Sequence, residues 1–447
     1  MNAFNDRPKQ PLGEDHLGKR ARVYESERAI LVSLQPPGSD GEPASQHELE
    51  ALADTAGIPT LAQVNQRRRL PVPATFIGKG KVAEIREAAN ELAADVIIFN
   101  DELSAAQARN LEEAIGRKVI DRTQLIMDIF AQRAATKEAK LQVELAQLRY
   151  LLPRLRGWGS ALTRLGGGIG TRGPGETQLE LDRKKITRRI HSIERRLAGA
   201  KRERTLRQKK RHCSPLPKIA LVGYTNSGKS TLLNTLCAAN TFVENKLFAT
   251  LSTTVRRGKL KSGRYALFID TVGFIRELPH HLIPAFTATL EAIYNADLIL
   301  HVVDLTSSTR EEDSHVVLET LNREIFATAA SRPPILSVFN KSDAYAGPTD
   351  PTIEGVSISA KDGHHIDALL RLICTTLDQN TTRTVLLIPY TDGDDLHQLI
   401  NQRDGRIIGY TEDGIEIEVR ISAQKLGQLR QAGVQVIACP SSRREDA

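Results

Sequence analysis

The sequence predicts an α/β protein built around a doubly wound, mostly parallel sheet. Two observations lead to this prediction. Between residues 215 and 380, short apolar runs such as KIALVGY, ALFID, LILHVVD and PILSVFN alternate with helical patterns, as they do in a parallel sheet covered by helices. Ahead of this part, apolar residues recur at spacings of three and four, which indicates amphipathic helices.

The chain is long enough for several domains, because 447 residues exceed the size at which one hydrophobic core stops growing. Hydrophobic residues make up 40% and charged residues 26%, as in ordinary globular proteins. We predict a disordered tail at 1–25, an N-terminal α/β domain at 26–133, a basic helical hairpin with a glycine-rich loop at 134–214, the doubly wound domain at 215–380 and a small C-terminal α/β domain at 381–447.

The two flanking domains show alternating patterns of their own. In the first, we expect a helix at 81–92, a buried strand at 95–99, a second helix at 105–115 and a short strand at 118–120. In the last, TVLLIPY, a short helix, the hairpin-like stretch RIIGYTEDGIEIEVRI and VQVIA are enough for a small α/β unit.

Two amphipathic stripes predict the helical hairpin. The first stripe contains Leu141, Leu145, Leu148 and Leu152, and the second contains Leu179, Ile186, Ile190, Ile193 and Leu197. The segment between them, at 157–176, ends in GGGIGTRGPGE and is too long and polar for a minimal helix turn. We expect it to protrude from the tip of the hairpin.

Positive charge is concentrated in the second hairpin helix. The formal net charge is +7, yet Arg183 to Arg211 alone holds fourteen Lys or Arg against two Glu. A solvated surface face remains the alternative, but fourteen mutually repelling cations favour a polyanion. Aromatic residues make up only 4%, so structured RNA is a better expectation than single strands stacked on aromatic side chains.

The four cysteines, Cys213, Cys237, Cys374 and Cys439, are scattered without C-x-x-C pairing, which argues against a zinc ribbon or a disulfide framework. The N-terminus lacks the apolar core of a signal peptide, and the apolar runs are too short to span a bilayer. We therefore expect a cytoplasmic protein without a membrane span, and nothing in the sequence demands more than a monomer.

Residues Gly223 to Ser230 read GYTNSGKS and match the phosphate-binding pattern G-x-x-x-x-G-K-[ST] directly after an apolar strand. In such a loop, glycines let backbone N–H groups turn toward the phosphates. Lys229 is expected to reach the β- and γ-phosphates, and the Ser230 hydroxyl to ligate Mg²⁺. This loop alone does not separate ATP from GTP.

A second pattern indicates which nucleotide base the site binds. Residues 340–343 read NKSD after the apolar strand 335–339, and a carboxylate at Asp343 can accept hydrogen bonds from both N1–H and the exocyclic amine of guanine. Adenine offers no such pair of donors. Residues 359–361 (SAK) follow a further strand, where a backbone N–H would meet the guanine carbonyl.

The residues that we expect to sense the γ-phosphate follow the apolar strand 266–269. Asp270 to Gly273 (DTVG) places Asp270 in the second coordination sphere of Mg²⁺ and the Gly273 N–H near the γ-phosphate. Thr250 is the candidate threonine that closes over Mg²⁺ when triphosphate is bound. Thr253 and Thr254 remain rivals for that role.

Phe274 stands where many GTPases have a glutamine that orients the attacking water. A phenyl ring cannot hydrogen-bond water, so we expect slow intrinsic hydrolysis that a partner stimulates. Simple packing of Phe274 in a switch helix is compatible with this expectation.

Together these patterns predict a P-loop GTPase domain with GTP as substrate and Mg²⁺ as cofactor. The candidate catalytic residues are Lys229, Thr250 and Gly273, and the candidate metal ligands are Ser230 and Thr250. The candidate nucleotide-binding residues are Gly223, Tyr224, Thr225, Asn226, Ser227, Gly228, Lys229, Ser230, Phe248, Ala249, Thr250, Leu251, Ser252, Asp270, Thr271, Val272, Gly273, Asn340, Lys341, Ser342, Asp343, Ser359, Ala360 and Lys361.

Over nearly its whole length the chain resembles the HflX-type GTPases, which are ribosome-associated P-loop proteins. The resemblance rests on DRTQLIMDIFAQRA at 121–134, KLQVELAQLRYLLPRL at 140–155, GGIGTRGPGETQLE at 167–180, GYTNSGKSTLLN at 223–234, LFATL at 247–251 and DTVGFIRELPHHLI at 270–283. The run GTRGPGETQLE is the most specific of these.

This resemblance implies binding to the large ribosomal subunit, with the hairpin and its loop reaching into ribosomal RNA. It also implies a role in splitting or rescuing stalled ribosomes under stress. One departure stands out: where the family usually continues LFATL with D-P-T-T-R, this chain has STTVR at 252–256. The departure concerns the first switch segment and leaves the phosphate loop intact.

Two other functions remain open at this point. One is an assembly or quality-control checkpoint that binds ribosomal RNA without splitting ribosomes. The other is a regulatory GTPase that acts through a protein partner, in which case the basic helix is incidental.

Overall fold

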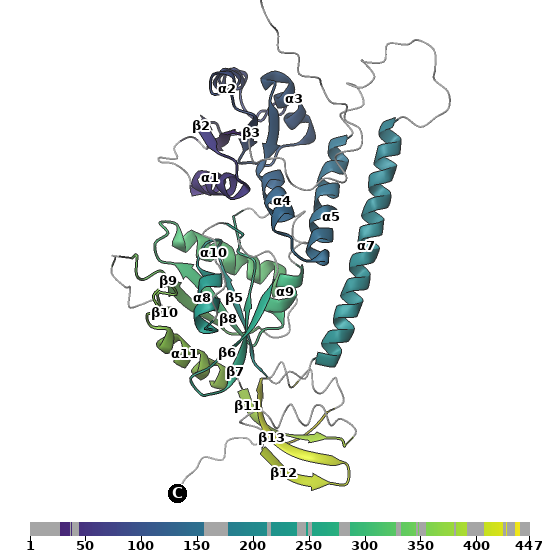
Figure 1. The fold of residues 1–447 in the computed structure, drawn as a ribbon, viewed down its shortest axis with the longest axis vertical. Coiled ribbons are helices and arrows are strands. Elements are labelled where there is room, and N and C mark those ends of the chain that lie inside the picture. Colours follow the sequence, from purple (N-terminus) through teal and green to yellow (C-terminus); the bar gives the residue numbers. More distant parts are fainter. Residues whose placement is uncertain are drawn as a thin grey trace, which may run out of the picture. The chain divides into compact units, whose positions relative to one another are not determined.

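The computed structural model describes residues 27–35, 37, 44–155, 178–211, 216–238, 247–248, 253–276, 287–327, 332–345, 347, 355–379, 381–390, 406–422, 426 and 434–438 (Figure 1). The chain divides into two compact units, residues 1–132 and 133–447, and each is described by itself. The predicted tail at 1–25, the glycine-rich loop at 157–176 and the predicted C-terminal helix between TVLLIPY and RIIGY lie outside the described residues.

The first unit is a small α/β domain with a four-stranded parallel sheet in the order β2-β1-β3-β4. Its elements are β1 (Ala29–Gln35), α1 (Ala44–Ala56), β2 (Thr60–Arg67), α2 (Lys79–Glu91), β3 (Val96–Phe99), α3 (Ala105–Ile115), β4 (Lys118–Asp121) and α4 (Arg122–Arg133). All four residues of β3 are buried, as expected for a strand covered on both faces.

Local signals in the sequence explain where α3 begins and ends. The Ser104 side chain accepts from the Gln107 N–H, and the Gln107 side chain accepts in return from the Ser104 N–H, which completes a capping box. At the other end, Gly116 adopts a left-handed conformation with φ of 74°. The predicted bounds of this helix therefore agree with the structure.

The hairpin consists of α5 (Lys137–Arg154) and α7 (Gln178–Arg211), which lie side by side in Figure 1. Leu145, Leu148, Ile190 and Ile193 form its buried centre, with Leu141, Leu152, Ile186 and Leu197 packed around them. Two ion pairs cross the same interface, Arg149 to Glu194 at 2.7 Å and Arg189 to Glu144 at 2.7 Å. The described members of both predicted stripes therefore meet.

The central domain contains a six-stranded sheet in the order β10-β9-β8-β5-β7-β6. Neighbouring strands are parallel except for β6, which runs antiparallel to β7 at the edge. The elements are β5 (Lys218–Gly223), α8 (Lys229–Leu236), β6 (Thr254–Lys259), β7 (Tyr265–Asp270), α9 (Thr287–Tyr294), β8 (Leu298–Asp304), α10 (Arg310–Thr320), the π-helical turn η4 (Leu321–Ile325), β9 (Ile335–Asn340), β10 (Val356–Ser357) and α11 (Ile366–Gln379).

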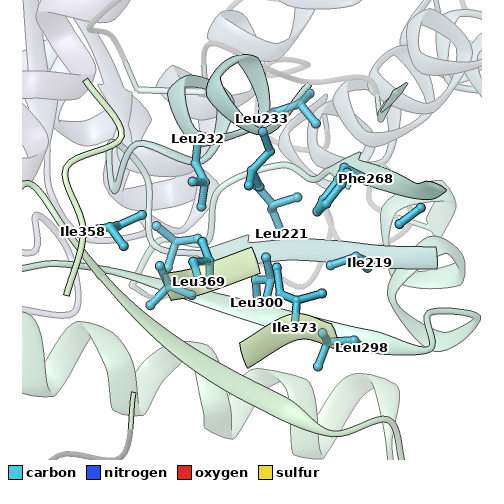
Figure 2. Close-up of a cluster of buried hydrophobic side chains, with 14 of the residues drawn as sticks. Ile219, Leu221, Leu232, Leu233, Phe268, Leu298, Leu300, Ile358, Leu369 and Ile373 are labelled. Atoms are coloured by element: carbon cyan, nitrogen blue, oxygen red, sulfur yellow. The ribbon is translucent and has the colours of Figure 1, made fainter. Parts of the chain in front are cut away.

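Both faces of this sheet are buried, and successive residues of β5 show it. Ile219 and Leu221 join a cluster with Leu232, Phe268 and Ile373, part of which Figure 2 shows. Ala220 and Val222 point to the other face, into a second cluster that includes residues of α9, α10 and η4. The predicted doubly wound, mostly parallel sheet is therefore confirmed.

The C-terminal module is a four-stranded antiparallel sheet in the order β12-β13-β11-β14. Its strands are β11 (Thr381–Ile388), β12 (Arg406–Thr411), β13 (Gly414–Ser422) and β14 (Gln435–Ala438). Alternate residues of the two central strands, including Leu386, Ile417 and Val419, form its core. None of the helices described in either unit is long and apolar enough to cross a membrane.

Candidate functional site

The phosphate loop connects β5 to α8 and fits closely against its neighbours. A Cβ atom at Gly223 would lie 2.2 Å from the Val302 carbonyl oxygen of β8, which no side chain tolerates. Gly228, the N-cap of α8, has φ of 89°, and a Cβ there would lie 2.2 Å from Asn340 Nδ2. Both glycines of the sequence pattern are therefore required by backbone geometry.

The Lys229 ammonium lies inside this loop. Its Nζ donates to the carbonyl oxygens of Gly223 at 3.1 Å and Tyr224 at 2.7 Å, which leaves one of its three N–H donors for a further acceptor. Only 6% of Lys229 is exposed, and this burial lowers its pKa to about 8, although the charge of Asp270 acts in the opposite direction. An anion in the loop would therefore satisfy a cation that burial otherwise disfavours.

Two oxygen-bearing side chains meet beside the lysine. Ser230 Oγ, in the first turn of α8, donates to Asp270 Oδ2 at 2.6 Å, and Asp270 ends β7 with 1% of its surface exposed. The next residue, Thr271, anchors this end of the strand by donating to the Leu221 carbonyl at 2.6 Å. A hydroxyl and a carboxylate fit Mg²⁺, which prefers oxygen ligands and takes few of them from the protein when it binds a nucleotide.

The loops after β9 and β10 are joined to the phosphate loop through Asn340. Its Nδ2 donates to the Ser227 carbonyl at 2.9 Å, and its Oδ1 accepts from the Ala360 N–H at 3.0 Å. The Ser342 N–H also donates to the Ile358 carbonyl at 3.1 Å. Lys341, with φ of 66°, extends away from this bridge and pairs with Asp304 at 2.6 Å.

Asp343 is exposed next to a turn formed by residues 359–363. The Ser359 side chain accepts from the Asp362 N–H at 3.1 Å, and the Ser359 carbonyl accepts from the Gly363 N–H at 2.9 Å. A hydrogen bond from Ser359 lowers the pKa of Asp343, and the charge of Lys361 contributes in the same direction. The carboxylate is therefore ionised at neutral pH and can accept hydrogen bonds from a base.

The segment after β7 packs against the phosphate loop. A Cβ at Gly273 would lie 2.8 Å from Thr225 Cα and 3.1 Å from Lys229 Nζ, so the chain passes too close for any other residue. Val272 is 2% exposed, and Phe274 is 8% exposed and packs with Val222 in the cluster that includes α9. Phe274 therefore packs in the core, as the packing interpretation predicted. It does so as part of an isolated β-bridge with Tyr224 and not in a helix.

The first switch segment is described only at its edges. Phe248 is 2% exposed with φ of 52°, whereas Ala249, Thr250, Leu251 and Ser252 lie outside the described residues. Thr254 begins β6 and pairs directly with Asp270 in the antiparallel ladder. The structure therefore brings Thr254 next to Asp270, whereas the position of Thr250 lies outside the described residues.

Sequence reasoning missed His301, a polar residue in the middle of β8. It pairs in register with Val222 and is 1% exposed. Burial lowers its pKa to about 4, and the charge of Lys229 adds to this effect, so the imidazole is neutral at physiological pH. The only signal in the sequence is a histidine within the otherwise apolar run LILHVV.

Three known families match consecutive parts of this chain. The family described as "GTP-binding GTPase N-terminal" matches residues 44–131, and "GTP-binding GTPase Middle Region" matches residues 133–211. The family described as "50S ribosome-binding GTPase" matches residues 218–341, which contain the phosphate loop, DTVG and the start of NKSD. The fold and the site define a P-loop GTPase.

Relatives identify the family within this class. The GTPase HflX of Caldanaerobacter subterraneus is 44% identical over 408 residues, which cover 91% of this chain and 94% of the relative. The GTPase HflX of Escherichia coli is 41% identical over 381 residues, which cover 83% and 88%. A GTP-binding protein from Sulfolobus solfataricus in complex with GDP is 25% identical, covers 79% of this chain and 99% of its own, and superimposes with a TM-score of 0.43. The chain belongs to the HflX family of GTPases.

The buried lysine predicts that nucleotide binding takes up a proton at alkaline pH. Without nucleotide, Lys229 loses its proton above about 8, and phosphates in the loop would raise its pKa again. We expect a small uptake at pH 7 that rises toward one proton at pH 9. Calorimetry of GDP binding in two buffers of different ionisation enthalpy measures this difference.

The matched control is Lys229→Arg, because a guanidinium stays protonated at both pH values. Its binding should show no extra uptake at pH 9. Equal and small uptake by the natural protein at pH 7 and pH 9 would contradict the lowered pKa of Lys229.

The exposed carboxylate of Asp343 predicts a change of base preference in Asp343→Asn. Hydrogen bonds to a charged group contribute about 1.5–3 kcal/mol, so GTP affinity should fall roughly 10- to 150-fold. Xanthosine triphosphate carries a carbonyl where guanine carries its amine, and the new amide can donate to it. Fluorescence titration of the variant with both nucleotides should show the preference reversed, and an unchanged GTP affinity would exclude the role assigned to Asp343.

Proposed function

We propose that this protein is a Mg²⁺-dependent GTPase of the cytoplasm that associates with the large ribosomal subunit and splits or rescues stalled ribosomes under stress. The observation that carries the proposal is the combination of the phosphate loop and its neighbouring loops, as far as the structure describes them, with a helix α7 that carries exposed arginines. The match of residues 218–341 to a family described as ribosome-binding supports the same partner.

Within the nucleotide site, each role follows from position. Lys229 would meet the β- and γ-phosphates with its remaining donor, and Ser230 would ligate Mg²⁺ with Asp270 behind it. Asp343 would read guanine, while Asn340 holds the surrounding loops in place. Thr250 remains the proposed threonine of the first switch, and Thr254 is its best-placed rival.

The hairpin offers cations to RNA on the side of α7 that does not face α5. Arg188, Arg195 and Arg196 are exposed, whereas Ile190 and Ile193 of the same helix are buried against α5. Some cations of α7 are already paired, as Arg189 is with Glu144, so the exposed arginines carry the proposed contacts to phosphate. Because phosphate contacts dominate such binding, the association should be sensitive to salt.

Hydrolysis in this account depends on the partner. Phe274 lies in the hydrophobic cluster beside Val222, so it presents no hydrogen-bonding group to an attacking water. A ribosomal contact would have to supply or order the missing group, as partners of other GTPases do. GTP then contributes differential binding between a docked and a released state.

The proposal predicts that the protein separates intact ribosomes even when hydrolysis is blocked. With a non-hydrolysable GTP analogue, one round of splitting should be visible as conversion of 70S particles to subunits in a sucrose gradient, and GDP should give none. If the protein instead binds only free large subunits and leaves 70S particles intact, it acts as a checkpoint, and the splitting proposal is wrong.

The role of the hairpin has a separate test. Changing Arg188, Arg195 and Arg196 to Gln should weaken binding to large subunits and reduce the slope of log affinity against log salt by about 3, because each of the three lost phosphate contacts contributes a little under one unit. A control with Arg86, Lys259 and Arg371 changed to Gln removes the same charge from exposed sites elsewhere. Equal losses in both variants would mean that the hairpin surface has no special role.

A further inference from the structure

The segment that follows β7, residues 272–276, is here called the start of the second switch segment. Main-chain hydrogen bonds hold it against the phosphate loop. The Phe274 N–H donates to the Gly223 carbonyl at 3.1 Å, and the Thr225 N–H donates to the Phe274 carbonyl at 2.8 Å. Tyr224 and Phe274 thus form an isolated parallel bridge. Because Gly273 lies within this stretch, its position over Lys229 depends on how firmly residues 272–276 are fixed.

Arg276 adds a side-chain anchor to this segment. Its backbone N–H donates to the Tyr224 hydroxyl at 2.9 Å, so the phosphate loop contacts the segment from a second direction. Its guanidinium donates to Asp313 Oδ1 through Nε at 3.2 Å and through Nη2 at 2.8 Å. The two side chains are only 20% and 13% exposed, so the pair is much less open to solvent than an ordinary surface ion pair.

Asp313 is itself immobilised in the first turn of α10. While Oδ1 binds the arginine, Oδ2 accepts from the Ser307 hydroxyl at 3.2 Å and from the Thr309 hydroxyl at 2.9 Å. The Asp313 N–H also donates to the Thr309 carbonyl at 2.9 Å. Helix α10 thus holds the Asp313 carboxylate in place, and Glu312 of the same turn also pairs with Arg276, at 2.8 Å.

We propose that Arg276 is a positioning residue for GTP hydrolysis. Its backbone N–H donates to the Tyr224 hydroxyl and its guanidinium binds the Asp313 carboxylate, so it fixes the backbone of residues 272–276, and with it the Gly273 N–H that would face the γ-phosphate. The proposal rests on the GTPase activity and is independent of ribosome binding. Because Phe274 cannot order the attacking water, hydrolysis should depend more strongly on backbone donors such as the Gly273 N–H. The position of this backbone should therefore matter for the rate.

The chemistry of the pair suits this role. Burial alone would lower the pKa of Arg276, but the hydrogen bond and the charge of Asp313 more than reverse that effect, so the guanidinium stays charged at every physiological pH. Lysine could keep the charge but not the paired N–H donors at Nε and Nη2. A displacement of catalytic groups by about 1 Å can lower a rate on the order of 100-fold, so losing one anchor should have a measurable effect.

The test compares basal GTP hydrolysis of the full-length protein without ribosomes. Arg276→Gln and Asp313→Asn should each lower kcat roughly tenfold and change KM for GTP less than twofold. Affinity for GDP with aluminium fluoride, which mimics the transferring phosphoryl group, should fall with kcat, while affinity for GDP alone should stay the same. Arg276→Gln also removes the 2.8 Å ion pair between Arg276 Nη1 and Glu312 Oε2, which Asp313→Asn leaves in place, so the two variants share only the contact to Asp313. The double variant should therefore be no worse than Arg276→Gln alone.

Two further variants distinguish an effect on the hydrolysis rate from an effect on the stability of the fold. Glu311→Gln removes the same charge from an exposed site on the same helical turn and should leave kcat unchanged. Arg276→Lys should retain the melting temperature and still lose most of the rate. The proposal is overturned if Arg276→Gln and Asp313→Asn keep kcat within twofold, or if their rate loss is matched by an equal loss of GDP affinity and thermal stability.

Discussion

The nucleotide site depends above all on one buried amide. Asn340 is 2% exposed and joins the phosphate loop to the loop after β10 through hydrogen bonds to Ser227 and Ala360. A buried amide that lost either partner would cost about 1–3 kcal/mol, so this bridge strongly favours one arrangement of the loops. Gly228 completes the constraint, because any side chain at that position would collide with Asn340 Nδ2. The phosphate loop and the proposed base-reading loops are thereby physically joined.

The sheet delivers these loops to one edge. Strands β5, β7, β8 and β9 are parallel neighbours, so their carboxyl ends present the phosphate loop, Asp270, Asp304 and Asn340 together. Burial on both faces keeps the strands in register, and the same burial makes His301 neutral and lowers the pKa of Lys229. Burying these polar groups costs free energy. A bound anion would offset that cost at Lys229.

Much of the fold was predictable because local signals specify it. Alternating apolar runs predicted the parallel sheet, and the capping residues of α3 fixed its bounds. Spacing alone could not predict that β6 runs antiparallel, that Phe274 pairs with the phosphate loop, or that Arg276 meets Asp313, 37 residues further along the chain. These contacts depend on tertiary packing, which brings together residues with no periodic relation. The individual site roles, including that of Thr250 outside the described residues, stay predictions.

We propose that this GTPase turns over efficiently only when a ribosomal partner is bound. The most direct measurement is steady-state GTP hydrolysis by the purified protein with and without large ribosomal subunits, at two salt concentrations, with Asp343→Asn as the specificity control. The account predicts strong stimulation that weakens as salt rises, because contacts to phosphate dominate docking. Unstimulated hydrolysis at the same rate with and without subunits would contradict it and would direct attention to a protein partner.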